Sequence, residues 1–127
     1  MGGLYVIDAC QGRFEIDWLN DKVDNRSVML LTGSKFFRGP PFSGAVIVPE
    51  SIMTKISDMK DDFKMPQGLN TFIGKVEIPR ELPHLRDQMK DNQNPGLAIR
   101  WVAALAEMEP TLSISAEVRQ DATTKWR

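Results

Sequence analysis

A chain of 127 residues with 42% hydrophobic and 26% charged side chains has the composition of an ordinary globular domain, which argues against disorder and fibrous repeats. Its 16 Lys and Arg residues nearly balance 17 Asp and Glu residues without a basic block, so neither nucleic acid nor an anionic membrane is an expected partner. The single cysteine, Cys10, allows no internal disulfide and fits a reducing compartment. Because no signal peptide or membrane-length apolar run is visible, we expect a cytoplasmic protein.

Three continuous apolar runs predict β-strands at residues 4–7, 28–31 and 45–48. Continuous rather than alternating apolarity predicts burial on both faces of the sheet. Residues 9–27 are long enough for the crossover that parallel strands require, whereas the next gap is rich in Gly and Pro. We therefore expect a parallel first pair and an antiparallel third strand in an α/β fold. Because the first strand begins almost at Met1, we also expect the chain to be truncated.

The rest of the sequence predicts helices separated by a long loop region. After Pro49, apolar residues at helical spacing predict a short helix, and scattered Gly and Pro residues in 61–96 predict an extended loop. Asn94 as N-cap and Pro95 at the first helical position open the strongest predicted helix. Residues 112–118 alternate between apolar and polar, which leaves strand and helix open. The apolar face of the predicted helix consists of Leu97, Trp101, Leu105 and Met108.

Chemically informative residues follow the first two predicted strands. Asp8 and Gln11 follow the first strand, and Thr32, Ser34 and Lys35 follow the second. Because neighbouring parallel strands end at the same sheet edge, where α/β sheets bind ligands, we expect these side chains to share a crevice. A lysine beside hydroxyls and glycine can hold a phosphate or form a Schiff base with a carbonyl, and composition does not choose between them. The residues around Lys35 lack the Walker pattern, which argues against an NTPase.

Three segments then carry a resemblance to a known family: 8–11 (Asp-Ala-Cys-Gln), 32–35 (Thr-Gly-Ser-Lys) and 39–45 (Gly-Pro-Pro-Phe-Ser-Gly-Ala). Together they resemble the cofactor-binding core of fold-type-I pyridoxal 5'-phosphate (PLP) enzymes of the class-V aminotransferase and cysteine desulfurase-like family. The resemblance covers residues 4–49 in detail. It implies an α/β large domain with a mostly parallel sheet, an antiparallel return strand and flanking helices.

The resemblance also implies a role for each residue of the predicted crevice. Asp8 would pair with the pyridine nitrogen of PLP, Gln11 would hydrogen-bond its phenolic oxygen, and Lys35 would form the internal aldimine and shuttle a proton. Thr32 and Ser34 would lie near the phosphate, although Ser34 stands where the family commonly has histidine. The implied substrate is amino-acid-like, and the implied intact enzyme is a homodimer with part of its site at the interface.

Four other residues have side chains that could act in a site. Arg38 and Arg100 are candidates for contact with a substrate carboxylate, although a solvated arginine is the commoner outcome. Cys10 is interpreted as a small packed residue and not as a nucleophile. His84 has no second histidine in the chain, so no metal site is expected there and an exposed loop position is predicted.

Two interpretations of the whole chain stay open. In the first, residues 1–127 are part of a PLP-dependent large domain, with 97–127 leading towards a missing small domain. Only seven residues precede Asp8, too few for the family's phosphate loop and stacking aromatic residue, so this chain alone is expected to be inactive or incomplete. The alternative is a non-catalytic α/β binding or interaction module that has lost cofactor chemistry. A long exposed apolar sheet edge would favour the first interpretation, and a fully covered sheet the second.

Overall fold

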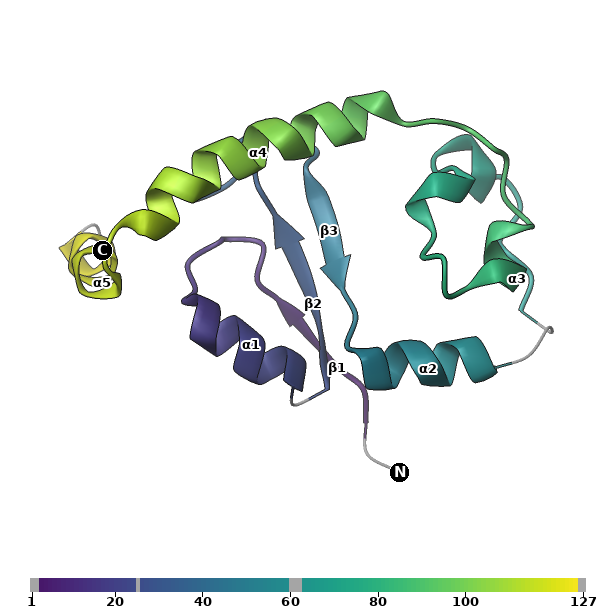
Figure 1. Cartoon of the computed structure of the whole chain (residues 1–127), viewed down its shortest axis with the longest axis horizontal. Coiled ribbons are helices and arrows are strands. Elements are labelled where there is room, and N and C mark those ends of the chain that lie inside the picture. The colour runs from purple at the N-terminus through teal and green to yellow at the C-terminus, as the bar shows by residue number, and fades with distance from the viewer. Residues whose placement is uncertain (1–2, 25, 60–62, 126–127) are drawn as a thin grey trace.

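A small mixed sheet forms the centre of the computed structural model, which describes residues 3–24, 26–59 and 63–125 (Figure 1). β1 pairs in parallel with β2, and β2 pairs antiparallel with β3. The α/β class and both strand directions are therefore confirmed, whereas the sheet is mixed and not mostly parallel. This three-stranded sheet does not show the fold of a PLP transferase. The strands are β1 (Tyr5–Asp8), β2 (Ser27–Thr32) and β3 (Gly44–Ile47), in the order β1-β2-β3.

The predicted crossover between the parallel strands contains helix α1 (Ile16–Asp24), which packs against β2. An aromatic cluster joins the start of this helix to the loop after β2. The ring of Phe14 stacks on Trp18 with centroids 6.3 Å apart and meets Phe37 edge-on at 6.2 Å. Phe37 is only 3% exposed. Contacts between these rings hold the α1 end of the crossover against the carboxyl end of β2.

Burial in the sheet is uneven, which corrects the prediction that its apolar strands are covered on both faces. The central strand β2 carries Met29, which is 0% exposed. In the edge strand β1, by contrast, Tyr5 is 71% and Val6 56% exposed, and Val46 of β3 is 58% exposed. The reason is position, because an edge strand has a neighbour on one side only and no other described element covers these side chains.

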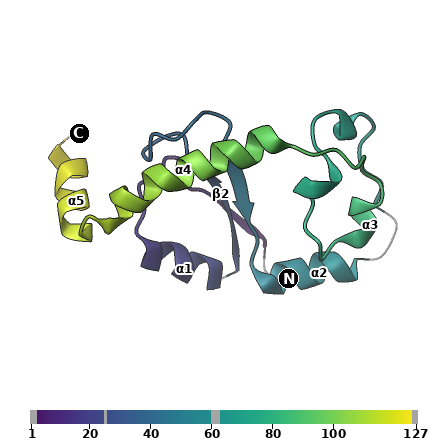
Figure 2. The ribbon, with the colours of Figure 1, turned by 45° about the horizontal axis from the view of Figure 1, so that its top comes forward.

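Helix α4 (Pro95–Ser113) crosses the end of the sheet where β2 finishes and β3 begins (Figures 1 and 2). Its predicted N-cap is confirmed, since the side-chain oxygen of Asn94 accepts a hydrogen bond of 3.1 Å from the backbone of Leu97. Trp101 fastens the helix to β3 by donating its indole N–H to the carbonyl of Gly44 at 3.1 Å. The predicted apolar face is confirmed only in part, because Leu105 is 56% exposed. The residue of α4 that is fully buried is Ala104, which the sequence did not single out.

The C-terminal segment is helical, which resolves the pattern that the sequence left open. α4 continues through Pro110, although proline cannot donate the usual bond to the preceding turn. After Ile114, which has extended dihedral angles, the chain enters α5 (Ala116–Lys125). Residues 112–118 therefore contain the end of one helix and the start of another. Trp126, which the sequence did not place, lies outside the described residues.

Between β3 and α4 the chain forms helix α2 and a lobe of short turns, defined here as residues 63–94. The predicted helix after Pro49 is confirmed by α2, with Ile52 buried. The predicted loop region contains short helical turns and no long element, as expected from its Gly and Pro content. No helix in the described part of the chain is long and apolar enough to cross a membrane. The elements are α2 (Glu50–Asp58), the 3-10 turns η1 (Leu69–Thr71) and η2 (Lys75–Glu77), and α3 (Pro83–Arg86).

Candidate functional site

The carboxyl ends of β1 and β2 lie side by side, as the sequence predicted. In the parallel register Asp8 is the partner of Leu30, so β1 ends beside β2 two residues before Thr32. The ladder extends one step further, because the backbone of Ala9 donates to the carbonyl of Leu30 at 2.9 Å. The two polar segments therefore start from neighbouring points on one edge of the sheet.

Beyond the strands, hydrogen bonds continue to join these segments. The hydroxyl of Thr32 lies 3.5 Å from the carbonyl of Cys10 in a geometry that allows donation. The backbone N–H of Phe36 donates to the carbonyl of Gln11 at 3.3 Å. We call residues 8–11 and 32–36 together the rim. Because these hydrogen bonds involve backbone groups of both segments, they fix the backbone from which the side chains of the rim extend.

Asp8 is an exposed carboxylate with a local partner at the rim. Its Oδ1 accepts a hydrogen bond of 3.0 Å from the backbone of Cys10. This bond, together with one from the Cys10 thiol, lowers the pKa of Asp8. The same thiol contact, partial burial and the negative charge of Asp8 raise the pKa of Cys10, and the positive charge of Lys35 opposes that rise. Asp8 is therefore ionised at neutral pH, whereas Cys10 is held as the unreactive thiol.

Lys35 and two hydroxyls complete the polar part of the rim. The hydroxyls of Thr32 and Ser34 lie 3.1 Å apart, and the backbone of Ser34 donates to the Thr32 hydroxyl at 3.2 Å. The Lys35 side chain is exposed and forms no salt bridge with any described residue. Its electrostatic effect on Cys10 shows that its charge acts on the same rim as Asp8.

Hydrogen bonds of Gly33, Gly39 and Ser43 fix the loop that follows Lys35. Gly39 donates its backbone N–H to the carbonyl of Gly33 at 2.8 Å, and Gly33 donates to the carbonyl of Ser43 at 2.9 Å. A Cβ atom on Gly39 would lie 2.6 Å from the Gly33 carbonyl and 2.8 Å from Ala104 on α4. Ser43 is fully buried and donates its hydroxyl to the carbonyl of Pro40 at 2.8 Å. This close approach explains the glycine at position 39.

Of the remaining candidates, Arg38 contacts the rim through its backbone N–H, which donates to the carbonyl of Lys35 at 3.0 Å. Arg38 extends into solvent and lies 3.5 Å from Glu107, so it matches the commoner outcome of a solvated arginine. Arg100 lies near Gly96 in the first turns of α4. His84 belongs to helix α3 and is half-buried, which corrects the expected exposed loop position. The described residues contain no group of three or more His, Cys, Asp or Glu side chains that could hold a metal ion.

One feature near the rim was not predicted from the sequence. Arg119 of α5 forms an ion pair with Glu15, which precedes α1. The same guanidinium donates to the carbonyls of Leu112 at 3.0 Å and Ile114 at 2.6 Å, at the end of α4. Arg119 therefore joins three elements beside the rim. No local signal reveals this pair, because its members are separated by 104 positions in the sequence.

Comparisons of the chain with protein-family models, with curated proteins and with solved structures found no match in any of the three. The function must therefore be argued from the rim itself. What the rim provides is a carboxylate, a lysine amine, two adjacent hydroxyls and an amide side chain at one edge of a sheet.

Proposed function

We propose that the rim binds PLP and that the chain is part of a PLP-dependent, transferase-like enzyme acting on an amino-acid-type substrate. The observation that carries the proposal is that Asp8 and Lys35 follow the ends of two neighbouring parallel strands and that the charges of both act on Cys10 between them in the rim. Adjacent hydroxyls of Thr32 and Ser34 precede the lysine. Asp8 would pair with the pyridine nitrogen of PLP, Lys35 with its aldehyde, and the two hydroxyls with its phosphate. The end of a strand is also where α/β sheets bind ligands.

The state of Asp8 fits the cofactor. Hydrogen bonds from Cys10 lower the pKa of Asp8, so its charge is present at neutral pH without a buried cation. Such a charge is what a protonated pyridine nitrogen requires as a partner. When bound, PLP supplies an electron sink for the carbanion formed at the α-carbon of an amino acid. Asp8 contributes by keeping a negative charge at the atom that must remain protonated.

The state of Lys35 fits the same proposal. Its exposed amine is not engaged by a carboxylate in the described part of the chain, so Nζ is accessible to an aldehyde and afterwards to a proton. The hydroxyls of Thr32 and Ser34 are the nearest phosphate donors in sequence. Gln11 is fixed by its backbone while its exposed side chain remains available for the phenolic oxygen. Each residue acts by binding or orienting the cofactor, except Lys35, which also moves a proton.

The exposed edge of the sheet favours an enzyme domain over a self-contained module. Leu4, Tyr5 and Val6 are 62%, 71% and 56% exposed, so the described residues leave an apolar edge uncovered. Contiguous apolar surface of this kind marks an interface. Under the proposal, a second copy of the protein or a further domain covers this edge, in keeping with a homodimeric enzyme.

Titration of the chain with PLP, followed by visible absorption, tests the proposal. We expect a saturable band that is weak in this chain and is lost in Lys35→Ala. Lys55→Ala is the matched control, because Lys55 is an equally exposed lysine on α2, away from the rim. Asp8→Asn should retain part of the band, because Lys35 is still present and asparagine has nearly the shape of aspartate. The band should be weaker, because the negative charge that pairs with the pyridine nitrogen is lost.

Pyridoxal without the phosphate separates site binding from general lysine chemistry. If Thr32 and Ser34 hold the phosphate, pyridoxal should bind more weakly than PLP, and inorganic phosphate should compete with PLP. Equal binding of both compounds, or equal bands in Lys35→Ala and Lys55→Ala, would contradict the proposal. That result would leave the non-catalytic module as the better interpretation.

A further inference from the structure

A hollow lies beside the rim, between residues 12–15, Phe36 and α5. It encloses about 310 Å³. A second hollow of about 280 Å³ shares Arg13, Phe36 and Thr123 with the first. Because the two share these lining residues, we treat them as one depression and call it the α5 pocket. Each hollow has about the volume at the lower end of small-molecule sites.

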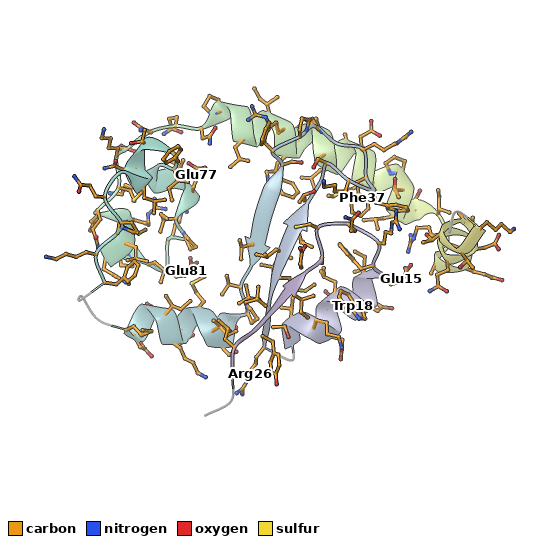
Figure 3. The ribbon with its side chains drawn as sticks, turned by 180° about the vertical axis from the view of Figure 1, so that it is seen from behind. Glu15, Trp18, Arg26, Phe37, Glu77 and Glu81 are labelled. Atoms are coloured by element: carbon orange, nitrogen blue, oxygen red, sulfur yellow. The ribbon has the colours of Figure 1, made fainter. Side chains whose placement is uncertain are left out.

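The wall of the α5 pocket is fixed by the ion pair between Arg119 and Glu15. Figure 3 shows Glu15 on the side of the sheet that faces α5. The Arg119 side chain is 13% exposed and also donates to carbonyls at the end of α4. These bonds fix the position of its guanidinium, and Glu15 neutralises its charge. The pair holds α5 against the loop after β1, and the pocket lies between them.

Arg13 is the uncompensated charge of the α5 pocket among the described residues. Of the charged side chains that line it, Glu15 and Arg119 neutralise each other. Arg13 is exposed and pairs with no described carboxylate, and Asp121 on α5 is engaged by Lys125 at 2.6 Å. The pocket therefore presents one net positive charge that is free for a ligand.

The apolar part of the α5 pocket comes from two aromatic rings that other rings hold in place. Phe14 stacks on Trp18, and Phe36 meets Phe37 edge-on with centroids 5.9 Å apart. Phe14 and Phe36 both line the pocket. Fixed aromatic walls beside a single cation suit a ligand with an apolar body and one negative charge.

We propose that the α5 pocket binds a small aromatic or aliphatic monocarboxylate, with Arg13 on the carboxylate and Phe14 and Phe36 against the apolar body. The site does not depend on PLP, and Phe36 is the one residue of the rim that lines it. Titration with benzoate in the absence of PLP, followed by calorimetry and by backbone amide NMR shifts, tests it. Benzamide is the neutral isostere of the probe.

Benzoate should bind saturably and shift the amides of residues 12–15 and 122–124. Arg13→Gln should weaken binding by about tenfold or more, since a hydrogen bond to a charged group contributes about that factor. Arg80→Gln should leave the affinity unchanged, because Arg80 is an exposed arginine in the lobe. Benzamide should bind more weakly than benzoate, and added salt should weaken benzoate binding.

A second variant keeps the test independent of charge. Ala122 lines the second hollow and is exposed, so Ala122→Trp should fill the pocket and abolish benzoate binding without disturbing the core. Equal affinities for benzoate and benzamide, unchanged binding in Arg13→Gln, or no saturable binding would each overturn the proposal. Because PLP is absent, none of these outcomes bears on the cofactor site.

Discussion

The sheet unit of residues 5–47 and the lobe of residues 63–94 are stabilised by different kinds of contact. In the sheet unit, backbone ladders join three strands around Met29, which is fully buried. In the lobe, side chains bind the backbone: the amide of Gln88 donates to the carbonyl of Phe63 at 3.0 Å and accepts from the N–H of Met65 at 2.8 Å. The sheet unit is thus organised by strand pairing around one fully buried side chain, whereas polar side-chain contacts join the turns of the lobe.

This difference predicts how each region responds to change. The central strand β2 is hydrogen-bonded to both β1 and β3. Loss of packing at β2 should therefore destabilise all three strands together. The lobe buries Leu82 and Met89, but it is built from short turns that exposed side-chain hydrogen bonds join, which is typical of a region that opens locally. Mutations in the sheet unit should therefore lower the global stability, whereas mutations in the lobe should mainly raise local opening.

The largest expected effect comes from truncating matched methionines, Met29 in the sheet and Met89 in the lobe, which are 0% and 7% exposed. Met29→Ala should lower the free energy of unfolding by about 2–5 kcal/mol, the usual cost of a large cavity in a core. Met89→Ala should cost less globally and should speed amide exchange in the lobe alone. Urea unfolding and hydrogen exchange measure the two effects. Equal global losses would show that the two regions unfold as one unit.

A somewhat smaller effect is expected where α4 approaches the return loop. Gly39→Ala would put a Cβ atom 2.6 Å from the carbonyl of Gly33 and should cost about 1–3 kcal/mol. Gly44→Ala is the control, because a Cβ atom there meets nothing within 4 Å. Urea unfolding of both variants provides the measurement. A Gly39→Ala variant as stable as the control would show that α4 does not pack as described.

In the lobe, Gln88→Ala removes the amide that joins Phe63, Met65 and His84. We expect a loss of about 1 kcal/mol in the stability of this local structure, because these bonds are exposed to water. Faster amide exchange at Met65 would record it, with the sheet amides unchanged. Gln67→Ala, an exposed glutamine in the same lobe, should have no such effect. Faster exchange throughout the sheet would contradict the independence of the two regions.

The smallest expected effect is electrostatic and lies at the rim. Asp8 raises the pKa of Cys10 and Lys35 opposes that rise, so Asp8→Asn should lower this pKa and Lys35→Ala should raise it. Alkylation by iodoacetamide depends on the thiolate, so its pH profile should shift to lower pH in Asp8→Asn and to higher pH in Lys35→Ala. Lys55→Ala should not shift it. An unchanged pH profile in Lys35→Ala would show that the charge of Lys35 does not act on Cys10, which contradicts the description of the rim.

Much of the sheet unit could be predicted from the sequence because its signals are local. Continuous apolar runs identified the strands, the length of the crossover fixed their parallel pairing, and Asn94 with Pro95 marked the start of α4. The prediction of burial on both faces was wrong at Tyr5 and Val6, because apolarity indicates that a residue needs cover and does not say whether this chain supplies it. Proline disfavours the interior of a helix, but α4 continues through Pro110 to Ser113.

The candidate site was predicted in part for the same reason. Asp8 and Lys35 follow strands, and parallel pairing was enough to bring their segments to one edge. The α5 pocket was not predicted, because Arg119 and Glu15 meet only through the path of two later helices. Nor did the sequence indicate the bonds of Gln88, which depend on how the turns of the lobe are arranged. Local pattern therefore predicted the rim and not the elements packed around it.

The central claim, that Asp8 and Lys35 belong to one PLP site, is tested most directly by reduction with borohydride after brief exposure to limiting PLP, followed by peptide mapping. The pyridoxyl label should be concentrated on Lys35, relative to the exposed lysines Lys55 and Lys125, and should become less selective in Asp8→Asn. A label spread evenly over the exposed lysines, or concentrated on a lysine outside the rim, would contradict the claim.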